Sequence, residues 1–282
     1  MAASKDKGSP PSAGTAGEAY SSDRALLTHL AEKAGEIGLT YFRARNEVRY
    51  KSGNSPVSEA DDAIDDFLRN GFAEARPSYG WLSEETADTD ARMEKRLEGS
   101  RVVIADPIDG TRGFIEGSEE WCISIAIVEN DRPVHAILHC PALGRTFLAS
   151  HGKGLELKGV PARPRKSAGK PRVTGSKKLI SIIEALPGKP FECAPFIPSL
   201  AYRLALVAIG ELDGAFARPG ASEWDVAAAD LILEEAGGQL SDTDSNPLRY
   251  NQSRVILPGL VAGHRQKHGE ILSLAKQTGV IQ

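Results

Sequence analysis

The chain has 282 residues, with 41% hydrophobic and 26% charged side chains and a formal net charge of −4. This composition is typical of a soluble globular protein, and the length allows one large domain or two small ones. The acidic balance argues against a broad nucleic-acid-binding surface, so no nucleic-acid partner is expected, although a local cationic pocket for a phosphorylated metabolite is compatible with it.

The sequence carries no targeting signal that we can identify. No apolar stretch approaches the roughly 20 residues that a transmembrane helix needs, and the N-terminus lacks the apolar region of a secretory signal. The three cysteines, Cys122, Cys140 and Cys193, form neither a disulfide framework nor a metal knuckle. We therefore expect a cytoplasmic protein without a membrane segment.

The N-terminal region is expected to contain a tail and two helices. Residues 1–20 are rich in Gly, Pro, Ser, Ala and Lys, and we interpret them as a disordered tail because they can bury little apolar surface. Apolar residues at helical spacing predict an amphipathic helix over Ala25–Phe42, with Ser22-Asp23 as its N-cap. A second helix is predicted over 58–76. Asp61 lies one turn inside it, where the helix dipole favours an acidic side chain and where it can also face a site.

Two neighbouring glutamates end the next predicted strand, Gly80–Glu85. Adjacent carboxylates repel each other unless a cation or basic partner lies nearby, but Glu84 and Glu85 taken alone could also be a solvated pair. The charge-rich segment Ala87–Gly99 that follows is expected to be a mobile excursion.

The apolar strand Arg101–Ile104 leads into a segment, Asp106–Thr111, that reads Asp-Pro-Ile-Asp-Gly-Thr. Its proline fixes one φ angle, and its glycine permits a conformation that other residues avoid. Asp-Pro and Asp-Gly are also common in ordinary turns, so the segment alone has an alternative interpretation. Two carboxylates three residues apart on a rigid turn can bind one hard cation or a neighbouring pair. Oxygen ligands alone favour Mg²⁺, Mn²⁺ or Ca²⁺ over zinc.

The middle of the chain predicts a β-meander and then a boundary. Strands are expected at Trp121–Val128, Val134–Cys140 and Thr146–Ser150. His135 and His139 share one strand face without a third ligand, so we interpret them as histidines of the sheet rather than as zinc ligands. Residues 160–178, dense in Pro, Arg, Lys and Ser, are expected to be an exposed connection between two halves.

The last third alternates between strands and helices. Glu223-Trp224-Asp225 opens one of the helices, and Gly237-Gly238 ends it as a C-cap. Strands are predicted at Leu179–Ile183, Ala215–Ala217, Gln239–Ser241 and Leu260–Ala262, and helices at Leu200–Ile209, Val226–Ala236 and around His268–Lys276.

These motifs together resemble the inositol monophosphatase family of Mg²⁺-dependent, lithium-sensitive phosphatases. The Asp-Pro-Ile-Asp-Gly-Thr segment and the later Trp224-Asp225 with Gly237-Gly238 are the two signatures, and the similarity runs from about Asp23 to Ala262. The resemblance implies a layered αβαβα sandwich of α+β class. Its expected parts are the tail 1–20, an N-terminal α+β half over 21–158 that binds the metals, and a C-terminal α/β half over 159–282.

The resemblance also implies a set of site residues. Glu84, Asp106 and the carbonyl of Ile108 are expected to hold a first Mg²⁺ ion, and Asp106, Asp109 and Asp225 a second, with a third ion helped by Asp61. Thr111 and Glu84 are expected to orient the attacking water, which makes Glu84, Thr111 and Asp61 the predicted catalytic residues. The predicted substrate-binding residues are Asp109, Gly110, Thr111, Arg112, Arg203 and Asp225.

Three details resemble the 3′(2′),5′-bisphosphate nucleotidase branch. Arg112 follows the motif threonine directly, where a cation could hold a second phosphate. Arg203 lies where the sequence resembles a Ser-Ser-Leu-Lys segment of that branch, and Tyr250-Asn251 also resembles it. Solvated surface arginines are the alternative interpretation.

The predicted activity is therefore Mg²⁺-dependent removal of the 3′-phosphate from adenosine 3′,5′-bisphosphate, a by-product of sulfate assimilation. One alternative is hydrolysis of inositol 1-phosphate or histidinol phosphate with the same two or three metal ions. An alternative of another class is a non-catalytic regulator that keeps the fold. Inhibition by lithium is expected, and a homodimer is compatible with the family.

Overall fold

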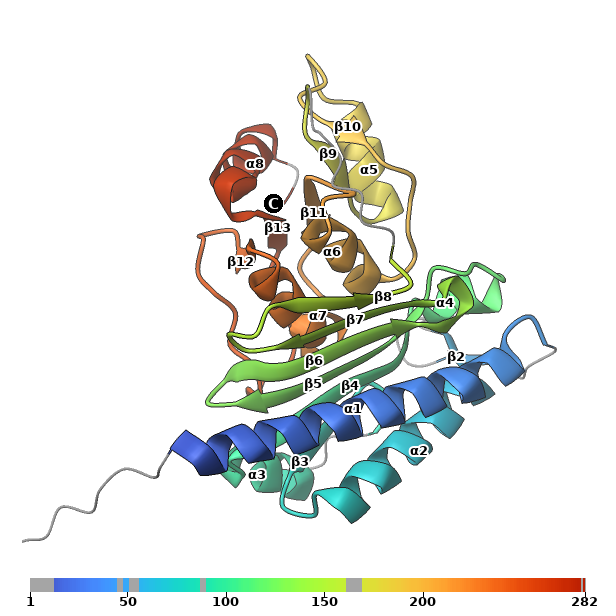
Figure 1. The fold of residues 1–282 in the computed structure, drawn as a ribbon. Coiled ribbons are helices and arrows are strands. Elements are labelled where there is room, and N and C mark those ends of the chain that lie inside the picture. Colours follow the sequence, from blue (N-terminus) through green and yellow to red (C-terminus); the bar gives the residue numbers. More distant parts are fainter. Residues whose placement is uncertain are drawn as a thin grey trace, which may run out of the picture.

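A computed structural model describes residues 13–44, 48–50, 56–86, 90–160, 169–279 and 281. Figure 1 shows five layers, in which two sheets alternate with three layers of helices. Helices α1 (Ala13–Tyr41) and α2 (Glu59–Ala75) cover the outer face of the larger sheet, and α6 (Leu200–Ala208) and α7 (Glu223–Glu235) lie between the two sheets. Helix α5 (Lys177–Glu184) and helix α8 (Arg265–Thr278) form the last layer. The expected αβαβα sandwich is confirmed.

The larger sheet has six strands in the order β3-β4-β5-β6-β7-β8. Strands β3 and β4 are parallel, and every later pair is antiparallel. Strand β4 is buried on both faces: Val103 packs toward α1 and α2, while Val102 and Ile104 pack toward α6 and α7. A strand covered on both sides therefore has a continuous apolar sequence. The strands are β3 (Gly80–Ser83), β4 (Arg101–Asp109), β5 (Cys122–Glu129), β6 (Arg132–Cys140), β7 (Arg145–Ser150) and β8 (Leu155–Lys158).

The smaller sheet has five strands in the order β10-β9-β11-β13-β12. Its inner face shares one apolar core with α6, α7 and the larger sheet, and its outer face packs against α5 and α8. The strands are β9 (Arg172–Thr174), β10 (Glu192–Cys193), β11 (Gly214–Ala217), β12 (Gly238–Asp242) and β13 (Leu260–His264). The remaining elements are the hairpin of β1 (Val48–Tyr50) and β2 (Pro56–Ser58), helix α3 (Asp90–Glu98), helix α4 (Thr111–Ile115) and a 3₁₀ turn, η1 (Pro141–Leu143).

The first helix departs from the sequence prediction. It begins at Ala13, so residues 13–20 of the expected tail are helical. Residues 1–12 lie outside the described residues. Asp23 is therefore no N-cap. It is buried and accepts hydrogen bonds from Arg76 and Arg101 at 2.6 Å each.

Two further predictions of local structure were wrong. Leu179–Ile183 belongs to helix α5, whose N-cap Ser176 accepts a hydrogen bond from the Leu179 N–H at 3.3 Å. The period of a short apolar run does not distinguish a strand from a buried helix. Here the Ser176 cap favours the helix. The segment expected to be a mobile excursion contains α3, whose Arg96 is fully buried.

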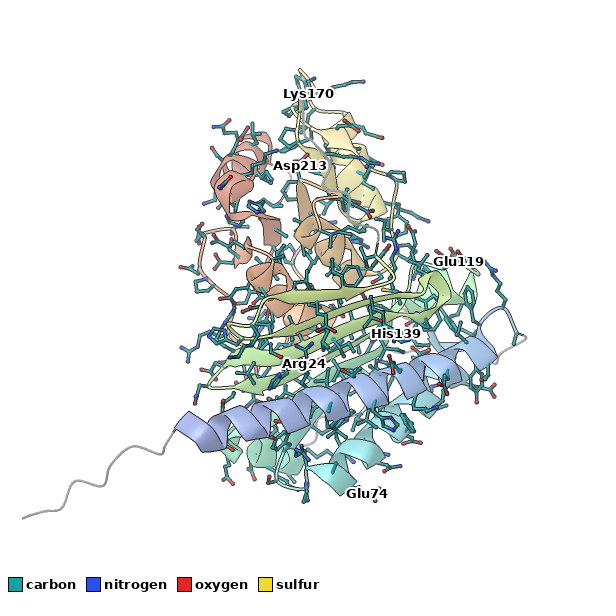
Figure 2. The ribbon with its side chains drawn as sticks, in the orientation of Figure 1. Arg24, Glu74, Glu119, His139, Lys170 and Asp213 are labelled. Carbon is teal, nitrogen blue, oxygen red and sulfur yellow. The ribbon has the colours of Figure 1, made fainter. Side chains whose placement is uncertain are left out.

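The two sheet histidines lie as predicted from the sequence. His135 is hydrogen-bonded to Ser150 and His139 to Thr146, each at 2.9 Å between Nδ1 and the hydroxyl oxygen. Figure 2 shows His139 on the sheet near α1, and its ring contacts Gly35 of that helix. Among the described helices, none combines the length and the apolar character that crossing a membrane requires.

Candidate functional site

A bulge at the end of β4 turns two aspartates to the same face of the sheet. Asp106 pairs with Ser124 of β5 and Asp109 pairs with Cys122, so β4 has one more residue than its partner between these points. Three residues apart on a regular strand, the two carboxylates would point to opposite faces. The extra residue of a bulge removes this alternation, and both carboxylates face the α6–α7 layer.

Gly110 follows the bulge and fits only as glycine. Its φ is +98°, in the left-handed region that favours glycine. A Cβ atom there would also lie 3.1 Å from the backbone nitrogen of Ser199, at the start of α6. The turn thus packs directly against α6 before α4 begins at Thr111.

Two more aspartates of the site lie in the first turns of helices that begin with the same capping motif. Asp61 is the third residue of α2 and accepts hydrogen bonds from the backbone N–H of Ser58 at 2.8 Å and from its hydroxyl at 2.7 Å. Asp225 is the third residue of α7 and accepts a hydrogen bond from the backbone N–H of Ser222 at 2.7 Å. In each case a capping box fixes the carboxylate in the first helical turn.

Three of the predicted carboxylates converge. Glu84, Asp106 and Asp225 each offer an oxygen atom, and these atoms lie within 4.8 Å of one another. Glu84 reaches this point because β3 and β4 are parallel and end at the same sheet edge, where the Glu84 N–H donates to the carbonyl of Ala105 at 3.3 Å. We call these three residues the carboxylate cluster.

Asp109 lies beside the cluster but has additional partners. Its carboxylate accepts hydrogen bonds from the N–H groups of Leu200 at 3.2 Å and Ala201 at 2.6 Å, and from the hydroxyl of Ser199. It therefore binds the N-terminus of α6, which the sequence analysis did not foresee. Ser199 also caps α6, by accepting a hydrogen bond from the Tyr202 N–H at 2.9 Å.

The carboxylates repel one another strongly. Burial raises the pKa of Asp106 well above its usual value, and the charges of Glu84, Asp109 and Asp225 raise it further. Burial, followed by the charge of Asp109, raises the pKa of Asp225 to about 8. Such buried carboxylates are compensated by a divalent cation bound to their oxygens. The donor set thus fits Mg²⁺, and Glu84, Asp106 and Asp225 are the residues that would hold it.

Thr111 pairs with Asp61. The Thr111 hydroxyl oxygen lies 3.1 Å from Asp61 Oδ1 and 2.9 Å from the carbonyl oxygen of Ile108. Burial raises the pKa of Asp61 to about 6, although its hydrogen bonds from Ser58 oppose the rise. The sequence analysis placed both residues at the site but did not foresee that they contact each other.

The two predicted substrate arginines have different surroundings. Arg112 is exposed. Arg203 is 7% exposed, and its guanidinium donates to the carbonyls of Ile197 at 2.7 Å and Pro198 at 3.0 Å. Both line a cavity of about 380 Å³ next to Gly110, which we call the rim cavity.

Sequence reasoning missed two lysines of the rim cavity. Lys177 and Lys178 line it together with Phe196, and the Lys177 ammonium lies 5.0 Å from the centre of the Phe196 ring. They belonged to the segment interpreted as an exposed connection. The Gly-Ser-Lys-Lys sequence with the Ser176 cap was the available signal, because it starts a helix.

Asp65 was missed as well. It accepts hydrogen bonds from Ser83 and from Thr86, the latter at 2.5 Å, and so fixes the segment that carries Glu84. Asp65 is one helical turn after Asp61, and this i, i+4 spacing was the signal that both face the same way.

Known proteins resemble the chain over almost its whole length. The 3′(2′),5′-bisphosphate nucleotidase CysQ of Aggregatibacter actinomycetemcomitans is 29% identical over 86% of this chain and 95% of its own. The histidinol-phosphatase of Mycobacterium tuberculosis is also 29% identical, over 89% of this chain and 96% of its own. A solved structure of an IMPase from Thermotoga maritima superposes with a TM-score of 0.77 at 25% identity, covering 91% of this chain and 97% of that one.

A family model also matches the chain. It is described as the inositol monophosphatase family, and it matches residues 20–279. The matched range includes both aspartate signatures, the capping boxes of α2 and α7 and the rim cavity. With its layered fold and converging carboxylates, the chain belongs to the inositol monophosphatase family.

Proposed function

We propose that the protein is a Mg²⁺-dependent phosphomonoesterase whose substrate is adenosine 3′,5′-bisphosphate, which it converts to AMP and phosphate. Relatives with two different named activities are equally similar to the chain. Overall identity therefore supports phosphate-ester hydrolysis, and the choice of substrate depends on the surroundings of the carboxylate cluster.

The cluster and the Thr111–Asp61 pair support the hydrolytic step. Bound Mg²⁺ supplies a water of lowered pKa and neutralises charge on the phosphoryl group. With a pKa of about 6, Asp61 is ionised at neutral pH and accepts the Thr111 proton in their hydrogen bond. The Thr111 oxygen is thereby oriented to accept a hydrogen bond from the attacking water. As it takes the proton of that water, it passes its own hydroxyl proton to the Asp61 carboxylate.

The rim cavity is the observation that carries the nucleotide assignment. Arg112, Lys177, Lys178 and Arg203 bring four cationic side chains to a cavity bordered by Gly110. Cations of this kind bind a second phosphate, and Phe196, which also lies 5.4 Å from the Arg203 guanidinium carbon, offers an aromatic face to a base. Inositol 1-phosphate and histidinol phosphate have one phosphate each and offer this cavity no second anionic group.

A substrate panel tests the assignment. We expect the purified full chain with Mg²⁺ to have a higher kcat/KM for adenosine 3′,5′-bisphosphate than for inositol 1-phosphate or histidinol phosphate. Lys178→Glu should lower kcat/KM for the bisphosphate by roughly 10-fold, because a charge-assisted contact is lost, with a smaller effect on the monophosphates. Lys153→Glu, an exposed charge reversal away from the cavity, is the matched control. A preference for a substrate with one phosphate and no base overturns the nucleotide assignment.

The alternative of a non-catalytic regulator is tested separately. The three converging carboxylates support an enzyme, because a divalent cation bound there can activate water and neutralise charge on a phosphoryl group. If an Asp106→Asn protein retained the cellular role of the wild type, the regulator would be favoured. Inhibition of hydrolysis by millimolar Li⁺ is part of the proposal, and insensitivity would count against the proposed metal chemistry.

A further inference from the structure

A second cavity, of about 360 Å³, lies between the C-terminal end of α2, strand β3 and helix α3. Figure 2 labels Glu74 on this end of α2. Among the residues that the structure describes, none that lines the cavity is acidic, although Arg69 is paired with Asp66 and Arg76 with Asp23. A chain with a net charge of −4 thus gathers positive charge at this cavity, which attracts anions. We call it the basic cavity. Its five cationic lining residues are Arg69, Arg76, Arg92, Lys95 and Arg96.

Aromatic side chains form the rest of its wall. Phe72, Tyr79 and Trp81 line the cavity, and the ring centres of Phe72 and Trp81 lie 6.0 Å apart at an angle of 41°. Trp81 and Tyr79 are partly exposed, so their rings are accessible from the cavity. Aromatic faces bind planar rings, and guanidinium groups bind phosphate oxygens.

The cationic side chains of the cavity differ in their burial and in their hydrogen-bond partners. The Arg96 side chain is fully buried and donates to Asn251 Oδ1 at 2.8 Å and to the Gln252 carbonyl at 3.0 Å. Arg76 is held by Asp23. Arg92 and Lys95 are exposed on α3. The two fixed arginines add positive charge to the wall of the cavity, and the exposed pair is accessible to a ligand.

We propose that the basic cavity binds a small organic phosphate that carries a planar ring, such as a nucleoside monophosphate. The ring lies against Trp81, and the phosphate contacts Arg92 and Lys95 at the open side. This site is distinct from the rim cavity, with which it shares no lining residue.

A chain of hydrogen bonds runs from the basic cavity to Asp65, which fixes the segment that carries Glu84 of the carboxylate cluster. Trp81 Nε1 donates to the Thr86 hydroxyl at 3.3 Å, and Thr86 donates to Asp65 at 2.5 Å. Both Trp81 and Thr86 line the cavity, and Glu84 lies between them in the sequence. A ligand held against these two residues therefore acts on the segment that positions Glu84. By linkage, ligand and Mg²⁺ change each other's affinity by the same factor.

The site is tested by titrating AMP into the full chain while tryptophan fluorescence is recorded. The titration is done in an Asp106→Asn background, so that the carboxylate cluster does not contribute. We expect saturable quenching that Trp81→Phe removes and that the double variant Arg92→Glu/Lys95→Glu weakens by about 10-fold or more. Lys153→Glu should leave it unchanged, and adenosine or inorganic phosphate alone should bind at least about 10-fold more weakly.

Two results would overturn the site: no saturable change up to millimolar AMP, or quenching that survives in Trp81→Phe or in Arg92→Glu/Lys95→Glu. AMP bound at the rim cavity as a product would not give a signal that depends on Trp81, which lines only the basic cavity, so the outcome is independent of the proposed activity.

The connection is tested by measuring the Mg²⁺ dissociation constant calorimetrically with and without saturating AMP. With an otherwise wild-type chain we expect a change of about threefold or more. Thr86→Val, which removes the bridging hydroxyl, should abolish this change while AMP still binds the cavity. The same change in Arg92→Glu/Lys95→Glu would place its origin at the carboxylate cluster and refute the coupling.

Discussion

The first turns of α2 and α7 are built alike and behave differently. Each starts with a serine N-cap whose backbone N–H donates to the aspartate three residues later, Asp61 in α2 and Asp225 in α7. Asp225 faces Glu84 and Asp106 within 4.8 Å. Asp61 instead faces the hydroxyl of Thr111 at 3.1 Å. The difference shows that a shared local motif fixes where a carboxylate points, while its partner across the site determines its chemistry.

The pKa values of Asp61 and Asp225 also differ, and for different physical reasons. Burial is the largest cause of the raised pKa in both aspartates, but hydrogen bonds from Ser58 and Thr111 limit the rise for Asp61 to about 6. For Asp225 the next cause is repulsion by Asp109, and the pKa reaches about 8. A cation relieves repulsion between carboxylates, so we assign metal binding to the α7 turn and proton handling to the α2 turn.

Asp225→Asn is expected to have the largest effect on activity, and it tests the assignment of metal binding to the α7 turn. We expect hydrolysis to fall by about 10³-fold or more, because an anionic ligand of Mg²⁺ is lost, and calorimetric Mg²⁺ binding to weaken in parallel. The Asn side chain can still accept the Ser222 hydrogen bond, so the fold should persist. Asp244→Asn, an exposed change in the same half, is the control. Unaltered Mg²⁺ affinity in Asp225→Asn would contradict the assignment.

Asp61→Asn should have a smaller and different effect. Loss of a proton acceptor in the Thr111 pair is expected to lower kcat by roughly 10²-fold, with Mg²⁺ affinity at the cluster little changed. Thr111→Val should lower kcat similarly, and the double variant should be no worse than either single one, since both act in one pair. Asp62→Asn alters the neighbouring exposed carboxylate and is the control. If Asp61→Asn weakened Mg²⁺ as much as Asp225→Asn, the two turns would share one role.

The pH dependence of stability sharpens the comparison. Carboxyl groups with raised pKa values retain protons in the folded state that the unfolded chain has released. The free energy of unfolding of the metal-free protein should therefore fall as pH rises from about 4 to 8, by about 1.4 kcal/mol per pH unit for each retained proton. Because Asp61 releases its proton near pH 6 and Asp225 near pH 8, Asp225→Asn should reduce the slope over the whole range from about pH 4 to 8, whereas Asp61→Asn should reduce it only below about pH 6.

Thermal unfolding in EDTA and in Mg²⁺ at several pH values measures this dependence. Stabilisation by Mg²⁺ should grow with pH, since the ion binds the deprotonated carboxylates. A metal-free protein that becomes more stable between pH 5 and 8 would show that the carboxylates are not under repulsion.

The smallest expected effects come from the two cap serines. Ser58→Ala and Ser222→Ala should each reduce the free energy of unfolding by about 1 kcal/mol, the usual cost of a lost N-cap. Only Ser58 also donates its hydroxyl to the aspartate, at 2.7 Å, so Ser58→Ala should raise the pKa of Asp61 further and lower kcat severalfold near pH 6. Ser222→Ala should leave kcat nearly unchanged. Equal kinetic effects of both would mean that the hydroxyl contact has no role.

The layered fold and the convergence of Glu84, Asp106 and Asp225 could be predicted because they depend on motif residues that the sequence displays directly. Parallel strands that end at one sheet edge explain why Glu84 and Asp106 meet. The position of Asp225 follows from the first turn of a helix that packs between the sheets.

The remaining features depend on contacts between segments far apart in sequence. The pairing of Asp109 with the N-terminus of α6 joins residues about 90 positions apart, and no local pattern encodes it. Burial of Arg203 against the carbonyls of Ile197 and Pro198 likewise depends on how one loop folds back. The helical state of Leu179–Ile183 was missed because a short apolar run has no distinctive period.

The bulge of β4 also limits where the chain can accept an inserted or deleted residue. Surface loops tolerate added or lost codons, but the spacing between Asp106 and Asp109 does not, because β4 is enclosed by protein on both sides. Removing one residue there would remove the bulge, and with it the local geometry that brings Asp106 to the carboxylate cluster and Asp109 to the N-terminus of α6. The connections between elements can therefore change in length, whereas the spacing of positions 106–109 cannot.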